Sequence, residues 1–172
     1  MKIRVLVKAF FVFALMVFSL DALSTAVFTW PAAPTATEIL ADAAFQTDVA
    51  SEWAASRSGD KAQRHEEGGW IVQCRTLNLS TQEYDLSYRV DGVPSGVKDG
   101  IAPGVPPVVG DDCRIIGFKH THPNPPTDED GTKWDQGPSK ADEGWHTRHG
   151  IPGIIVNAGG TASFGPANGT YQ

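Results

Sequence analysis

The spacing of apolar residues predicts one helix followed by two strands in the first half of the chain. From Thr37 to about Arg57 apolar residues recur at helical intervals, and Thr37 is the expected N-cap. Alternating apolar and polar residues then predict strands at 69–77 and 83–91, because successive side chains of a strand point to opposite faces. The Gly/Pro-rich stretch 92–109 is too long for a simple hairpin turn and is expected to be a loop beside any substrate groove.

The second half of the chain continues with shorter elements. The apolar run 114–118 predicts a buried strand, and the segments 153–157 and 161–164 flank a Gly-Gly pair typical of a closing hairpin. A short helix is expected to begin near Ser139. Together these elements predict an α+β fold: a single compact domain with a central mixed β-sheet, one long N-terminal helix and a short helix.

The first residues have the features of an export signal. Residues 1–26 combine a basic start, an apolar run and a small-residue cleavage site, which predicts a signal peptide. Residues 27–36 are then a flexible Pro/Ala-rich linker, and 37–172 the folded domain. An uncleaved N-terminal anchor is the alternative, and it is the one route to a membrane. A cleaved signal places the protein in the periplasm or outside the cell.

Charge narrows the choice of partners. The 172-residue chain has a formal net charge of −6, and removal of residues 1–26 makes it more negative because that segment is rich in Lys and Arg. A negative protein is repelled by phosphate backbones and by anionic lipids. The charge therefore argues against nucleic acid and anionic membranes as partners but does not identify a substrate; a peptide or protein substrate is expected only from the motif described below. It indicates nothing about the oligomeric state.

The two cysteines, Cys74 and Cys113, each lie in a strand-like run. In an oxidising compartment they can form a disulfide if those two strands are neighbours. Two separate buried thiols remain the alternative. A cysteine metal site is not expected, because neither cysteine belongs to a Cys-x-x-Cys pair.

A compound motif in the second half carries the candidate chemistry. His120 and His122 are two residues apart, so in an extended segment both point to the same side, and Pro123 then ends the strand. Asp142 follows three residues after Ser139, on the same face of the expected helix. Two imidazoles and one carboxylate can hold a zinc ion and leave its fourth position to water. This predicts His120, His122 and Asp142 as zinc ligands, with the Ser139 hydroxyl near the oxyanion.

Two other interpretations of these residues stay open. Ser139 and Asp142 can form a plain capping box at the start of the helix. His146 lies four residues after Asp142, so a site made of Asp142, His146 and one of the two strand histidines is also possible. Otherwise His146 and His149 are interpreted as rim or substrate-contacting groups, or as simply exposed.

The order His-x-His-Pro followed by Ser-x-x-Asp, with a glutamate upstream, resembles the JAMM signature of the JAB/MPN zinc metallopeptidases. Small bacterial JAB-like domains of uncharacterised function are the most similar members. The resemblance implies a JAB/MPN-like fold with the layering of cytidine deaminases, and a glutamate that takes a proton from the zinc-bound water. Glu66, ahead of the 69–77 strand in a Glu-x-Gly-Gly context, matches that glutamate, and Glu67 is the alternative.

The Pro-rich, acidic segment 124–138 departs from the family pattern, which places the proline and the serine much closer together. It is interpreted either as a lid or substrate-selecting loop, or as an ordinary solvated loop.

The motif and the export signal together lead us to expect an exported zinc-dependent peptidase or isopeptidase. The alternatives are a JAB-like binding or assembly module without catalysis, and a secreted toxin with the same chemistry.

Overall fold

The computed structural model describes residues 28–171, and the chain divides into a unit of residues 1–30 and a second unit of residues 31–172. In the first unit the rings of Phe28 and Trp30 pack edge to face, 5.5 Å between centroids. The predicted signal peptide, residues 1–26, lies outside the described residues. Within the described part of the chain, no helix has the length and apolar character that crossing a membrane requires.

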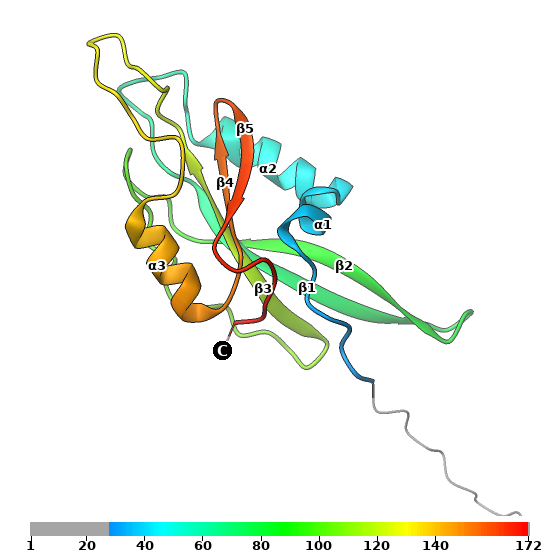
Figure 1. Ribbon diagram of the computed structural model, residues 1–172. Helices are drawn as coiled ribbons and strands as arrows, with labels where there is room; N and C mark the ends of the chain where they lie inside the picture. Colours follow the sequence, from blue (N-terminus) through cyan, green and yellow to red (C-terminus); the bar gives the residue numbers. More distant parts are fainter. Residues whose placement is uncertain (1–27, 172) are drawn as a thin grey trace, which may run out of the picture. The chain divides into compact units, whose positions relative to one another are not determined.

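The second unit is a small α+β domain built on a five-stranded mixed sheet, as the sequence predicts (Figure 1). The strands, in the spatial order β2-β1-β3-β4-β5, are β1 (Gly68–Asn78), β2 (Glu83–Gly92), β3 (Cys113–His122), β4 (Gly153–Asn157) and β5 (Gly160–Phe164). β3 and β4 run parallel, and the other neighbours are antiparallel. A parallel pair needs a crossover connection. Helix α3 (Lys140–His149) lies within that crossover.

The predicted long N-terminal helix is instead two helices, α1 (Ala36–Leu40) and α2 (Ala43–Ala55). Thr35, and not Thr37, is the first N-cap, because only from Thr35 does a glutamate fall at the third helical position and complete a capping box with Glu38. Asp42 then takes an extended conformation, and its side chain accepts a hydrogen bond from the Phe45 amide. A second N-cap therefore breaks the expected helix in two.

The helices cover opposite faces of the sheet (Figure 1). On one face, α1 and α2 bury Ile39, Phe45 and Val49 against the sheet. On the other face, Trp70 and Phe118 form an aromatic core, and Trp145 of α3 packs against it. Burial of side chains on both faces explains why the middle of the sheet reads as nearly continuous apolar runs.

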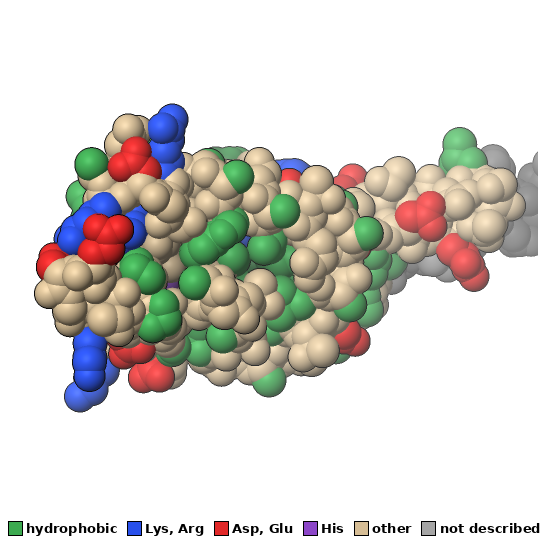
Figure 2. All heavy atoms as spheres, turned by 90° about the horizontal axis from the view of Figure 1, so that it is seen from above, with side chains coloured by type: hydrophobic (Ala, Val, Ile, Leu, Met, Phe, Trp, Pro, Cys, Tyr) green, Lys and Arg blue, Asp and Glu red, His purple; other side chains and the backbone are tan. Residues whose placement is uncertain are grey.

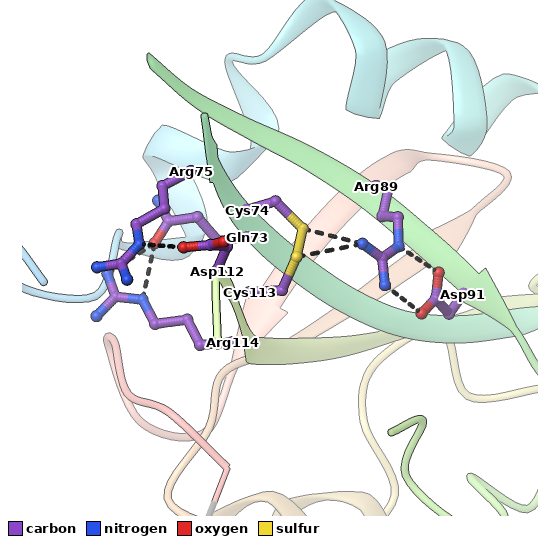
Figure 3. The surroundings of a disulfide bond; sticks show 8 residues. All are labelled: Gln73, Cys74, Arg75, Arg89, Asp91, Asp112, Cys113 and Arg114. Atoms are coloured by element: carbon purple, nitrogen blue, oxygen red, sulfur yellow. Dashed lines mark hydrogen bonds and ion pairs between the residues drawn. A yellow bond between two sulfur atoms is a disulfide. The ribbon is translucent and has the colours of Figure 1, made fainter. Parts of the chain in front are cut away.

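Cys74 of β1 and Cys113 of β3 form a disulfide, so the interpretation as two separate thiols is wrong (Figure 3). The two residues face each other in the β1–β3 register, with 4.1 Å between their Cα atoms. Arg89 of β2 donates a hydrogen bond to the Cys74 sulfur at 2.9 Å and pairs with Asp91. The disulfide thus fastens the start of β3, the central strand, to β1.

Candidate metal centre

β3 delivers two histidines to one point on the α3 side of the sheet. His120 and His122 are in the same strand, and their Nε2 atoms are 3.1 Å apart. The strand ends at His122, directly before Pro123, as predicted. Phe118 and His120 point to the face of the sheet that α3 covers. Lys119, between them in the strand, points to the opposite face and forms a buried ion pair with Glu52 of α2. The alternation of a strand is therefore what brings the two imidazoles together.

The surroundings hold both imidazoles in the neutral form that metal binding requires. Burial lowers the pKa of His120 to about 4. Burial also lowers the pKa of His122, against the opposing effects of Asp142 and Asp135. A neutral imidazole keeps a lone pair on one ring nitrogen, and that nitrogen is the atom that binds a metal.

Glu66 completes a cluster of three possible ligands with His120 and His122. One ligand atom from each of the three residues lies within 4.8 Å of the other two. The side chain is only 6% exposed. Burial, followed by the charges of Asp142 and Asp99, raises the pKa of Glu66 to about 8. A carboxyl group with a pKa near neutrality suits a general base.

The glycine at position 68, which follows Glu66 and Glu67, is needed for a structural reason. Gly68 pairs with His120 across the β1–β3 ladder. A Cβ atom at Gly68 would lie 2.5 Å from the Lys119 carbonyl oxygen and 3.1 Å from the His120 Cβ. Only glycine permits the close approach that sets Glu66 beside the histidine strand.

Glu67, the alternative base, forms hydrogen bonds with residues outside the cluster. Its carboxylate accepts hydrogen bonds from His65 Nε2 and Ser95 Oγ, both at 2.7 Å. Its backbone N–H donates to Thr121 Oγ1 at 2.9 Å. The geometry thus favours Glu66 and gives His65 the task of holding Glu67.

Ser139 and Asp142 form the capping box at the start of α3 and also face the cluster. Ser139 Oγ accepts from the Asp142 amide at 3.1 Å, and Asp142 Oδ2 accepts from the Ser139 amide at 2.8 Å. The other carboxylate oxygen, Oδ1, lies 3.8 Å from His120 Nε2. The two interpretations are compatible, because the cap uses one oxygen of Asp142 and leaves the other directed at the site.

His146 occupies a different environment from the one that a ligand needs. The helix continues past Gly144 and ends at His149, so His146 does share a face with Asp142. Its ring, however, is buried against Phe164, with Nδ1 3.2 Å from the Ile151 carbonyl oxygen. His146 is absent from the three-residue cluster that the described residues form. His149 stacks on Tyr171.

The segment 124–138 is a wall of the site. A pocket of about 340 Å³ lies over the cluster. It is lined by Glu66, His122, Ser139 and Asp142, by Asn124, Trp134, Asp135 and Gly137 of the segment, and by Asp99, Gly100 and Ile101.

Charged side chains of both signs lie side by side at one end of the face drawn in Figure 2. Among the ion pairs of the domain, Arg64–Asp128 and Lys61–Asp130 tie the segment to the residues before β1.

Comparison of the chain with models of protein families, with curated proteins and with solved structures finds no significant match. The resemblance to the JAB/MPN peptidases therefore stays a prediction that rests on the motif residues. The sequence did not identify Asn124, Trp134 or Asp99 as part of the site. No local pattern distinguishes them from other loop residues, although the 92–109 loop, which contains Asp99, was expected beside the groove.

Proposed function

We propose that this protein is an exported zinc-dependent peptidase or isopeptidase that hydrolyses an amide bond. The observation that carries the proposal is the convergence of His120 and His122 Nε2, 3.1 Å apart, beneath a pocket that also holds the Glu66 and Asp142 carboxylates. The disulfide supports export, because such bonds persist in oxidising compartments.

The donor atoms suit a zinc ion. Two nitrogens that bind one tetrahedral zinc at about 2.0–2.1 Å are about 3.3–3.4 Å apart. The 3.1 Å between the histidine nitrogens and the 3.8 Å from His120 Nε2 to Asp142 Oδ1 both lie within half an ångström of that separation. Asp142 is not part of the three-residue cluster, so its carboxylate would have to move toward His122 before His120, His122 and Asp142 could hold the metal together.

The remaining groups have separable roles. A bound zinc ion would supply Lewis acidity, lowering the pKa of a water molecule and polarising the substrate carbonyl. Glu66 would accept the proton of that water and pass it to the departing amine. Ser139 Oγ accepts a backbone hydrogen bond, so its own proton is free to be donated to the oxyanion.

One observation favours a second candidate, a binding module without catalysis. Glu66, and not Asp142, forms the three-residue cluster with the histidines. If Glu66 and Asp142 both bound the metal, four protein ligands would close the tetrahedron and leave no position for water. Such a site would be structural.

The variants Glu66→Gln and His122→Ala separate these roles. The zinc-loaded mature protein is incubated with a defined peptide pool, and new amino termini are counted by mass spectrometry. We expect Glu66→Gln to keep zinc and to cleave at least about 100-fold more slowly, because a general base contributes roughly that factor. His122→Ala should lose both zinc and cleavage.

Asp111→Asn, an exposed change before β3, is the matched control and should behave as the wild type. Zinc-loaded wild type without any cleavage would contradict the hydrolase. Loss of zinc in Glu66→Gln would assign Glu66 as a ligand and favour the structural site.

A further inference from the structure

The pocket above the metal centre contains hydrogen-bond acceptors that the proposed hydrolysis does not use. Besides Glu66 and Asp142, its lining includes Asp99 from the 92–109 loop and Asn124 and Asp135 from the 124–138 segment. These three residues belong to two separate segments of the chain. The pocket therefore has acceptors on two of its walls.

Asn124 provides a buried acceptor without a partner. The side chain is 5% exposed, and its Nδ2 donates to the Lys98 carbonyl oxygen. That bond fixes the orientation of the amide, so the opposite atom is the carbonyl oxygen Oδ1. Oδ1 is buried and has no hydrogen-bond partner within residues 28–171. A buried acceptor left unpaired is destabilising, and a ligand N–H that reached Oδ1 would supply the missing hydrogen bond.

Asp99 and Asp135 supply negative charge at the mouth of the same pocket. Both are exposed, and neither forms an ion pair with any residue in the described range. The neighbouring cation, Lys98, has its ammonium group 4.5 Å from the centre of the Trp134 ring. Asp135 Oδ1 accepts only the amide of Gly137 at 2.9 Å, which leaves its second oxygen available.

The apolar residues of the pocket suit a long side chain. Ile101 and Trp134 line it together with the acceptors. A lysine or arginine side chain has an apolar stem and a cationic, donor-only head. Such a group matches a pocket with apolar walls, a buried amide oxygen and two free carboxylates.

We propose that the site selects peptides with a basic side chain next to the scissile amide, and that Asn124, Asp99 and Asp135 determine this specificity. The basic side chain is a class of group, lysine-like or arginine-like, and not a particular protein. The proposal rests on the proposed function in one respect: it places the basic side chain of the substrate beside Glu66, the proposed general base. Binding of the basic side chain itself needs no catalysis.

The test measures binding of two matched peptides to the full mature protein. Acetyl-alanyl-lysine amide and acetyl-alanyl-norleucine amide have the same length and differ in the ammonium group. Their dissociation constants are measured by NMR titration, with and without zinc. We expect the lysine peptide to bind about two- to fivefold more tightly, the range expected for exposed charge pairs, and the difference to shrink as salt is raised.

The double variant Asp99→Asn/Asp135→Asn should abolish this preference, so that the two peptides bind with the same dissociation constant. Asp111→Asn is again the matched control. Equal affinity for the two peptides in the wild type, or an unchanged preference in the double variant, would overturn the proposal. So would a second zinc ion per chain that the double variant loses, because the carboxylates would then be a cation site.

Failure here is distinguishable from failure of the proposed function. A protein that binds zinc and cleaves peptides without preferring a basic side chain keeps its function and refutes the specificity. A protein that prefers the lysine peptide in the absence of zinc, and never binds zinc, keeps the specificity and loses the hydrolase.

Discussion

Asp142 illustrates how one side chain can cap a helix and also face a candidate metal centre. Its Oδ2 closes the capping box with Ser139, and its Oδ1 lies 3.8 Å from His120 Nε2. A cap fixes the χ angles of the carboxylate, so a ligand that also caps a helix is preorganised by the helix itself. The same reasoning applies to Ser139, whose oxygen accepts in the cap while its proton can be donated.

Substitution of Ser139 separates the cap from the hydroxyl. We expect Ser139→Ala to lower the free energy of unfolding by about 1 kcal/mol, and Ser139→Gly by only a few tenths, because glycine is a tolerated N-cap. Both variants lack the hydroxyl, so both should lose about 100-fold in cleavage rate if Ser139 stabilises the oxyanion. Urea unfolding and initial rates measure the two effects. Full activity in Ser139→Gly would restrict Ser139 to capping.

Among the elements, the 124–138 segment is fixed to the domain by ion pairs. Arg64 donates to both Asp128 oxygens at 3.2 Å, and the Asp128 side chain is only 2% exposed. Within the segment, Thr127 and Lys133 form an isolated β-bridge. An ordinary solvated loop would lack such buried contacts, so the segment is an ordered wall of the candidate site.

The Arg64–Asp128 pair predicts a pH dependence of stability. Burial opposes ionisation of Asp128, but the hydrogen bonds from Arg64 and the Glu129 amide outweigh it and lower its pKa below 3.8. A lowered acid pKa stabilises the fold above the unfolded value and loses that contribution as pH falls through the folded value. Asp128→Asn should therefore be less stable than wild type at pH 7, and the difference should narrow below about pH 3.8. A difference that is constant with pH would contradict this account.

Regular elements were predictable from the sequence, whereas the individual loop residues that line the pocket were not. The period of two placed His120 and His122 on one face, and the Ser-x-x-Asp spacing placed Ser139 at an N-cap, because both patterns depend on local geometry. The break at Asp42 was missed, since an apolar period continues across it. Asn124 and Asp99 join the site through tertiary contacts that no local pattern encodes.

At the scale of the whole molecule, the disulfide and the candidate metal centre lie at opposite ends of β3. Cys113 begins the strand, and His122 ends it. The bond joins residues 39 apart in sequence. Closing a loop of that size in the unfolded chain is worth about 4 kcal/mol in the chain-entropy model.

The double variant Cys74→Ser/Cys113→Ser should accordingly lose about 4 kcal/mol of unfolding free energy. We expect it to retain the zinc affinity of the wild type under conditions in which it stays folded, because the metal centre is at the other end of the strand. Guanidinium unfolding and zinc titration followed by circular dichroism test both statements. A folded variant with impaired zinc binding would show that the disulfide shapes the metal centre.

The most direct test of the account is the metal content of the protein, purified without added metal or chelator and measured by mass spectrometry. We predict close to one zinc per chain in the wild type, and none in His122→Ala. Absence of tightly bound metal in the wild type, even after addition of zinc, would contradict the metal centre and with it the proposed hydrolase.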